Sequence, residues 1–264
     1  MNIYHLLFYF FIYSFIGWCT EVAYAGFKEK QFVNRGFLNG PLCPIYGVGI
    51  VAVVMITSPF EKKMVLLYIV SAMVVTLIEL VTGFLMDKLF HHKWWDYKDL
   101  PLNIGGYVCL PFSLIWGFAC LFVIKIMHPV FVHFVNWMPH TLGLMLLIVL
   151  MVELLADVTV TYVEVGKLNK QLDAMEKVAH EMHQISDRIG INIFEKVTET
   201  MELQDKLAEA SEEQREKVHD LISRYKSSMK TSRLSTRMIK AFPSMESRLH
   251  NDALEKLKEK LKRN

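Results

Sequence analysis

Three long apolar stretches of this chain each contain a carboxylic acid well inside the stretch. The pairs are residues 3–26 with Glu21, residues 64–86 with Glu79, and residues 141–163 with Asp157. Each stretch is long enough to cross the roughly 30 Å hydrocarbon core of a bilayer as one helix. An ionisable side chain there costs at least about 2.5 kcal/mol unless it faces water, a partner or the interior of a bundle. The pattern predicts a membrane helix bundle in which these acids have a function.

Two further apolar segments, residues 44–58 and 110–127, bring the predicted number of spans to about five. The segment at residues 44–58 is the shortest and needs the residues from Pro41 to Pro44 to supply a turn. Basic residues are most numerous after the first and third spans, and such loops usually lie in the cytosol. We therefore predict a multi-pass protein with its N-terminus outside and its C-terminus in the cytosol.

Charge divides the chain into two parts. Residues 1–163 contain nine Lys or Arg and nine Asp or Glu, which leaves twenty and eighteen of the totals of 29 and 27 for residues 164–264. The predicted fold is an all-α membrane domain at 1–163, followed by a cytosolic, charged, coiled-coil-like helical tail at 164–264. Apolar residues from Leu168 onward recur every three or four positions, which predicts that the tail continues the fifth span as a helix.

The later part of the tail predicts a return helix. Residues 195–220 are acid-rich and residues 224–240 contain six bases and no acid, so a turn near Ser211 or Ser223 would let the two halves pair. Dimerisation is an alternative way to bury the apolar stripe. Pro243 should end this pattern, and a short basic helix should start at Ser244.

The first two acids begin similar sequence patterns. After Glu21 and after Glu79, a Gly near the helix exit is followed by a Gly-x-x-Cys motif and a Pro that opens the next helix. This indicates a parallel repeat of a helix pair, related by an axis along the membrane normal. Alternatively, Gly and Pro simply punctuate membrane helices. Helix-breaking residues at the entry of the second and fourth spans favour a cytosol-facing vestibule, or else close helix packing. Its candidate residues are Asn39, Cys43, Tyr46, Cys109, Ser113 and Trp116.

Several of these segments resemble a known family. The segments are residues 13–21, 34–47, 95–97, 101–104 and 112–117. They are similar to those of the ABC-transporter permeases of the CmpB type (ABC-transporter type IV), over about residues 13–121. The resemblance implies an integral protein of the bacterial plasma membrane and a permease role, without indicating a substrate or any catalytic residue.

The sequence also bears on partners. It contains no GxxxxGKS/T phosphate loop, so ATP hydrolysis would have to come from another polypeptide. Five spans are few for a translocation pathway, which favours a homo-oligomer, a second membrane subunit or a separate ATPase beside the lipid bilayer. The function predicted is a non-enzymatic, non-ATPase permease subunit. The alternatives are a membrane-anchored sensor or scaffold whose tail recruits a cytosolic partner and, more weakly, an intramembrane hydrolase.

Other candidate sites have simpler interpretations. His91, His92 and Asp96 could ligate a metal, but no matching ligand spacing occurs, and we predict neither a metal nor a cofactor. The neighbouring aromatic residues Trp94, Trp95 and Tyr97 are typical of interfacial anchors. Glu153 and Asp157 are four residues apart on one helical face, where they could share a proton, bind a cation or be satisfied by neighbouring helices.

The tail carries a basic patch that could contact anionic lipid or a soluble partner. Its members are Arg224, Lys226, Lys230, Arg233, Arg237 and Lys240. A face that is solvated or paired within the chain is the simpler interpretation. Nucleic acid is disfavoured, because Tyr225 is the only stacking residue in the stretch.

Overall fold

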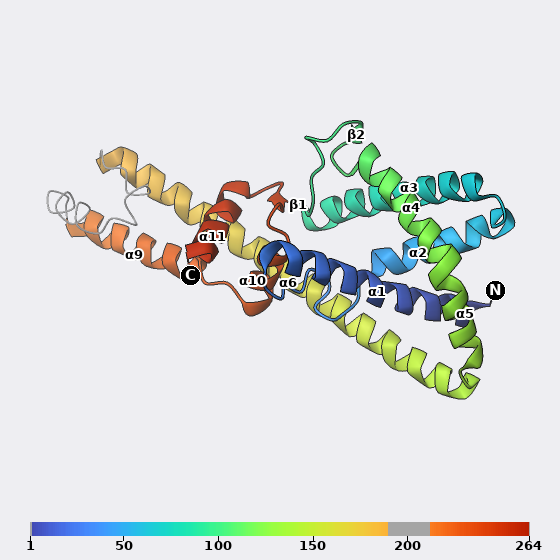
Figure 1. Ribbon diagram of the computed structural model, residues 1–264. Coiled ribbons are helices and arrows are strands. Elements are labelled where there is room, and N and C mark those ends of the chain that lie inside the picture. The colour runs from blue at the N-terminus through green and yellow to red at the C-terminus, as the bar shows by residue number, and fades with distance from the viewer. Residues whose placement is uncertain (1, 190–211, 264) are drawn as a thin grey trace. The chain divides into compact units, whose positions relative to one another are not determined.

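The computed structural model describes residues 2–189 and 212–263, and it consists almost entirely of helices (Figure 1). The chain forms two compact units. The first unit comprises Met1–Val163 together with Arg237–Glu246, and the second comprises Glu164–Thr236 together with Ser247–Asn264. A segment late in the sequence is therefore part of the first unit. The assignment of residues 1–163 to the bilayer and of 164–264 to the cytosol stays a prediction.

Four helices among the described residues are long and apolar enough to cross a membrane. They are α1 (Ile3–Glu29), α3 (Met64–Phe90), the continuous helix Leu110–Trp137, and the apolar part of α6 (His140–Ile189). The helical membrane bundle predicted from the sequence is confirmed. The apolar side chains that remain exposed, such as Leu77, Phe118 and Val152, suit contact with lipid tails.

The second predicted span is shorter than the other four. Helix α2 covers Pro44–Thr57 and ends in a single 3₁₀ turn, η1 (Ser58–Phe60). Its 14 residues extend only about 21 Å at the usual rise of an α-helix, less than the thickness of a hydrocarbon core. The reason lies in the segment before α2, which returns alongside α1 before the helix starts.

The fourth predicted span is longer than the sequence indicated. Helix α4 (Leu110–Phe122) continues through a π-helical turn, η2 (Val123–Met127), into α5 (His128–Trp137). Pro129 lacks the amide hydrogen that an α-helix would direct back to residue 125, and the wider π turn directly before it accommodates that loss. The end predicted at Met127 was therefore wrong, because the proline modifies this helix without ending it.

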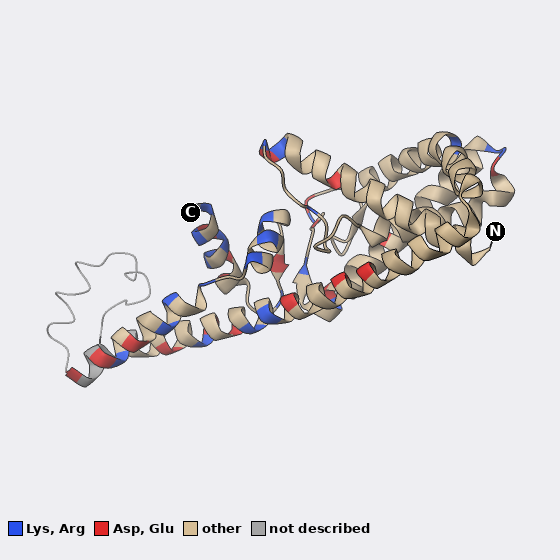
Figure 2. Ribbon diagram, turned by 90° about the horizontal axis from the view of Figure 1, so that it is seen from below, with Lys and Arg blue, Asp and Glu red and all other residues tan. Residues whose placement is uncertain are grey.

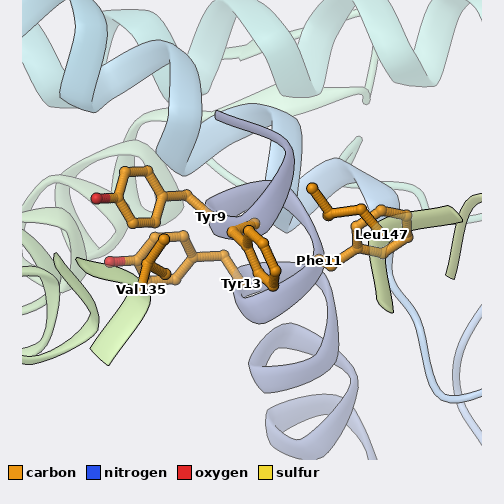
Figure 3. Packing of buried hydrophobic residues seen from close by; sticks show 6 residues of the cluster. Tyr9, Phe11, Tyr13, Val135 and Leu147 are labelled. Atoms are coloured by element: carbon orange, nitrogen blue, oxygen red, sulfur yellow. The ribbon is translucent and has the colours of Figure 1, made fainter. Parts of the chain in front are cut away.

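The core of the first unit is built on aromatic residues of α1. Tyr9, Phe11 and Tyr13 are buried together with Val135 of α5 and Leu147 of α6 (Figure 3). Helices α1 and α2 pack closely because Gly47 leaves no side chain between them: a Cβ at that position would lie 2.4 Å from the carbonyl oxygen of Phe10. Small residues allow this close approach in membrane bundles.

Short strands order the longest loop of the first unit. Strands β2 (Asn103–Ile104) and β3 (Val108–Cys109) form an antiparallel pair joined by Gly105, Gly106 and Tyr107, and both glycines have positive φ angles. Glycine adopts that conformation without the steric penalty that other residues incur. The remaining strands are β1 (His92–Lys93) and β4 (Glu246–Ser247).

The second unit consists of charged helices, in contrast to the mostly uncharged helices of the first (Figure 2). Its members are the later part of α6, α9 (Glu212–Ser228), the beginning of α10 (Arg233–Ala241) and α11 (Asn251–Arg263). Helix α9 runs antiparallel to α6, since Arg224 pairs with Glu181 at 3.1 Å and Gln171 donates to the carbonyl of Ser228 at 2.7 Å.

The tail follows its predicted pattern only in part. Helix α6 does continue the fifth span, and Leu168, Leu172, Met175 and Met182 of its stripe are buried without a second chain. A turn near Ser223 was wrong, because this residue lies inside α9, and the alternative at Ser211 lies outside the described residues, as does most of the acidic segment. The last helix begins at Asn251 and not at Ser244.

Candidate functional site

Two long loops, one between α1 and α2 and one between α3 and α4, have similar geometry. We call residues 30–43 the first return loop and residues 91–109 the second. Each preceding helix ends in a residue with a left-handed conformation, Lys30 with φ 53° and His91 with φ 59°. Each loop then runs back along the helix it has just left before the next helix begins. The parallel repeat predicted from the sequence stays a prediction.

The first return loop reaches back to the middle of α1. The amide of Cys43 donates to the carbonyl of Ser14 at 2.9 Å, so α2 begins beside the middle of α1 and not beside its end. The side chain of Tyr46 lies against Gly17, where an added Cβ would be only 2.3 Å from Cγ of the tyrosine ring. Loop backbone beside helices of span length needs internal hydrogen-bond partners.

Helix α6 supplies the first set of these partners. The carboxylate of Asp157 accepts hydrogen bonds from the amides of Asn39, at 3.0 Å, and Gly40, at 2.7 Å. The side-chain amide of Asn39 donates to the hydroxyl of Thr161 at 3.1 Å. Asp157 thus has a structural task in this arrangement, which corresponds to the alternative that the neighbouring elements satisfy it.

Helix α10 supplies the second set. Arg237 donates to the carbonyl oxygens of Gly36 at 2.8 Å, Phe37 at 3.1 Å and Asn34 at 3.3 Å. The planar guanidinium group suits several acceptors at once, and burial lowers the pKa of Arg237. Trp18 of α1 completes the set by donating to the Asn34 side chain at 2.8 Å. Three helices therefore fix one loop.

Glu21 lies where this loop meets α2. Its carboxylate accepts a hydrogen bond from the hydroxyl of Tyr46 at 2.6 Å and forms an ion pair with Arg35 at 3.5 Å. The guanidinium of Arg35 also lies over the ring of Tyr24 at 4.6 Å. Glu21 thus has both a hydrogen-bond donor and a counterion.

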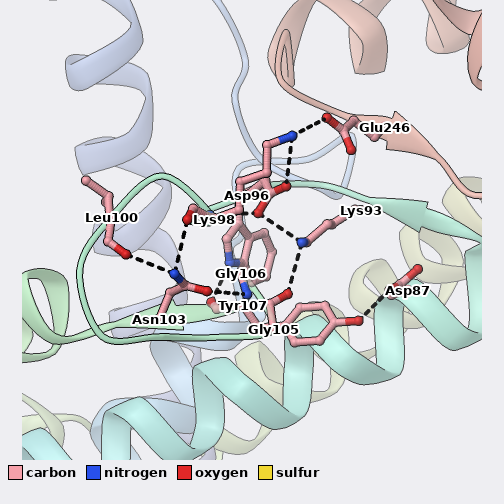
Figure 4. Close-up of polar contacts among 11 residues, drawn as sticks. Asp87, Lys93, Asp96, Lys98, Leu100, Asn103, Gly105, Gly106, Tyr107 and Glu246 are labelled. Carbon is pink, nitrogen blue, oxygen red and sulfur yellow. Dashed lines mark hydrogen bonds and ion pairs between the residues drawn. The ribbon is translucent and has the colours of Figure 1, made fainter.

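The second return loop is held mainly by its own side chains (Figure 4). Lys93 donates to Asp96 at 2.9 Å and to the carbonyl of Gly105 at 3.0 Å. The hydroxyl of Tyr107 donates to Asp87 of α3 at 2.5 Å, which ties the loop to the helix before it. Lys98 reaches Glu246 at 3.5 Å, so the late segment of the first unit contacts this loop as well.

Glu79 is the acid of the second helix pair, and its surroundings differ from those of Glu21. Only 8% of the residue is exposed. Its Oε1 accepts a hydrogen bond from the hydroxyl of Tyr97 at 3.3 Å, while Oε2 is buried with no hydrogen-bond partner among the described residues. Burial and the nearby carboxylates of Glu79 and Glu21 raise the pKa of Tyr97, so both acids act on the same hydroxyl.

The remaining candidates, Glu153 and the predicted vestibule residues, have different surroundings. Glu153 is exposed on α6, and no hydrogen bond joins it to Asp157 among the described residues. Of the vestibule candidates, Tyr46 and Trp116 meet edge to face with ring centroids 6.0 Å apart. Ser113 donates back to the carbonyl of Cys109. Cys43 and Cys109 are buried at the N-cap positions of α2 and α4, and Asn39 belongs to the first return loop.

The predicted aromatic anchors have contacts within the protein. Trp94 is only 2% exposed and packs against Phe37 and Phe242. Trp95 donates to the carbonyl of Tyr107 at 2.8 Å, and Tyr97 stacks on Phe112. Sequence reasoning missed this role, because indole groups at a span end resemble membrane anchors whether they face lipid or protein.

The residues of the predicted basic patch have different surroundings. Arg237 belongs to the first unit and is partly buried there, whereas Arg224 pairs with Glu181 and Asp220 in the second. The other four bases are exposed. Among the described residues no group of three or more His, Cys, Asp or Glu could hold a metal ion, and this includes His91, His92 and Asp96.

A comparison with protein families now adds to the geometry. The model of the family described as "Putative ABC-transporter type IV" matches residues 8–162. The chain belongs to this family. The match covers α3, the helix Leu110–Trp137, both return loops and parts of α1 and α6, so the chain is a membrane protein of transporter-like type. No curated protein matched it, and neither did any solved structure.

Proposed function

We propose that this chain is the non-ATPase permease subunit of a transport system, and that the two return loops are the parts of it that control access. The observation that carries this proposal is that a tyrosine hydroxyl donates to an acid of each preceding apolar helix. Tyr46, in the first turn of α2 directly after the first return loop, donates to Glu21, and Tyr97 of the second return loop donates to Glu79. Transporter sites often lie where irregular backbone interrupts helices beside intramembrane acids.

The proposed setting is the bacterial plasma membrane, with several passes and the C-terminus in the cytosol. Basic residues after α1 and α3 and the charge-dense tail favour this orientation. A separate ATPase would supply the energy, and a second copy or a second membrane subunit would complete the pathway. The protein itself would have no catalytic activity.

Co-purification tests the proposal directly. Full-length protein would be isolated in mild detergent from its native cell and its partners identified by mass spectrometry. We expect one partner to be a polypeptide that hydrolyses ATP. The ATPase activity of the complex in proteoliposomes should change when this chain carries Glu79→Gln. Glu29→Gln is the matched control, because Glu29 is an exposed acid at the end of α1. Complexes that never contain an ATPase would count against a permease subunit.

One observation favours a sensor or scaffold as the second candidate. Arg237 and Glu246, both from the C-terminal part of the sequence, contact the first and second return loops respectively. A binding event that displaced this segment would therefore alter both loops. In that case cross-linking should capture a cytosolic regulator and no ATPase.

A further inference from the structure

We propose that Glu79 is a proton-binding site whose carboxyl group is protonated at neutral pH. The inference goes beyond the transport role, because it concerns the state of one side chain and can hold or fail independently of what the protein moves. It rests on the geometry around the two carboxyl oxygens.

The hydrogen bonding of Glu79 is too sparse for an ion. A carboxylate has two oxygens that accept several hydrogen bonds, and a buried charge without partners carries a large desolvation cost. Here Oε1 has one donor, the hydroxyl of Tyr97 at 3.3 Å, and Oε2 has none among the described residues. A neutral carboxylic acid at this position would avoid most of that cost.

The surrounding elements provide no counterion. Helix α3 packs against α2, α4, β1, β3 and η1. The titratable side chains of these elements are Tyr46, Cys120, His92, Lys93 and Cys109. Lys93, the lysine among them, is engaged by Asp96 and the carbonyl of Gly105. Within the described residues no Lys, Arg or His forms an ion pair with Glu79.

The other charged groups nearby do not compensate. On α3 itself, Asp87 is bonded to Tyr107, and Lys88 lies over the ring of Phe84. The carboxylate of Glu21 acts on the same Tyr97 hydroxyl as Glu79, and a second negative charge there would repel the first. Glu21 has its own cation in Arg35. Glu79 has no such cation among the described residues, and this favours a proton on Glu79.

A metal cation fits this site poorly. Hard cations such as Ca²⁺ require about six to eight oxygen ligands. Tyr97 supplies the one oxygen that approaches Glu79 within hydrogen-bonding distance among the described residues, and the same residues contain no metal-ligating cluster. A proton needs only one carboxyl oxygen.

Infrared spectroscopy of the full-length protein in lipid nanodiscs tests the proposal. The carbonyl stretch of a protonated carboxylic acid should be present at pH 7, absent in Glu79→Gln and retained in Glu21→Gln and Glu153→Gln. Tyr97→Phe should keep the band but shift it toward that of a carbonyl without a hydrogen bond. Adding Na⁺ at constant pH should leave the band unchanged.

Each alternative result would overturn the inference. A folded Glu79→Gln variant with the same spectrum as the unmodified protein would show that Glu79 is ionised. Loss of the band on adding Na⁺ would indicate a cation site. Failure of Glu79→Gln to fold, measured by thermal unfolding, would also contradict it, because an amide matches a neutral acid in size and charge.

Discussion

The carboxylate of Asp157 holds the backbone of Gly40, whose amide donates to Oδ2 at 2.7 Å across 117 residues of sequence. A Cβ at position 40 would lie 3.0 Å from the same oxygen, so the approach depends on glycine as well as on the acid. The carboxylate of an apolar helix thus accepts hydrogen bonds from backbone amides of the first return loop. This structural role explains why an acid lies in an apolar stretch, without a transported ion.

Replacing Asp157 with Asn should destabilise the first return loop. The amide keeps one acceptor oxygen but turns its NH₂ group toward one of the two backbone amides, which then loses its partner. Loss of a hydrogen bond to a charged acceptor costs about 1.5–3 kcal/mol. We expect a lower free energy of unfolding in detergent and faster hydrogen exchange at Asn39 and Gly40.

Glu153→Gln is the control for this measurement. Glu153 lies one helical turn away on α6 but is exposed. Its replacement should leave hydrogen exchange in the first return loop unchanged. Equal effects of the two variants would show that the helix, and not the Asp157 contact, determines the loop's stability.

Arg237→Lys should weaken the same loop from the opposite side. Lysine keeps the charge but replaces a planar fork with a single ammonium group, so it cannot reach the carbonyls of Asn34, Gly36 and Phe37 together. We expect trypsin to cleave at Arg35 faster than in the unmodified protein. Lys240→Arg, at an exposed position of the same helix, should have no effect. Unchanged cleavage in Arg237→Lys would argue against a role for the fork.

The sequence was sufficient to predict the helices but not the contacts of the acids. Hydropathy and length located the spans, because a helix that crosses lipid must be apolar over about 20 residues. The same reasoning treated Glu21, Glu79 and Asp157 as equivalent. They differ because Arg35 reaches Glu21 and two backbone amides reach Asp157, whereas Tyr97 is the one hydrogen-bond partner of Glu79 among the described residues. These partners depend on how the loops fold back, which no local pattern encodes.

The role of Arg237 was also beyond sequence reasoning. In the sequence it is one of six bases in a short stretch, and its charge alone indicated a surface patch. Its distinguishing feature is the set of three carbonyl oxygens around it, from residues about 200 positions earlier. Gly36, one of the three residues whose carbonyls accept from Arg237, was a weak signal in the sequence for such a contact. A glycine marks backbone that other groups can approach closely.

The second return loop should lose its order in acid. Burial alone would raise the pKa of Asp96, but the hydrogen bonds from Lys93 and from the amide of Lys98 hold this pKa below its usual value. A lowered pKa stabilises the folded loop at neutral pH, and that stabilisation is lost as the pH falls below about 4. The fluorescence of Trp94 and Trp95 should report the change.

Two variants distinguish Asp96 from general acid effects. Asp96→Asn should remove the fluorescence transition in acid, because the titrating group is gone. Asp99→Asn, at an exposed position in the same loop, should retain it. A transition that persists in Asp96→Asn would assign it to another acid, such as Asp87 beside Tyr107.

The last prediction concerns the packing of α2 on α1, on which the position of Tyr46 depends. Gly47→Ala should destabilise the protein by about 1–3 kcal/mol, because the new methyl group would lie 2.2 Å from the hydroxyl of Ser14 and 2.4 Å from the carbonyl of Phe10. Gly49→Ala is a matched control in the same helix, since an added Cβ there meets no atom within 4 Å. Alanine should be neutral or slightly stabilising at that position, because it favours helix more than glycine does. Thermal unfolding of both variants in detergent measures the difference, and the Glu21 to Tyr46 contact should be lost only in Gly47→Ala. Equal melting temperatures would show that α1 and α2 can separate without cost, and the first return loop would then lack the rigid support described above.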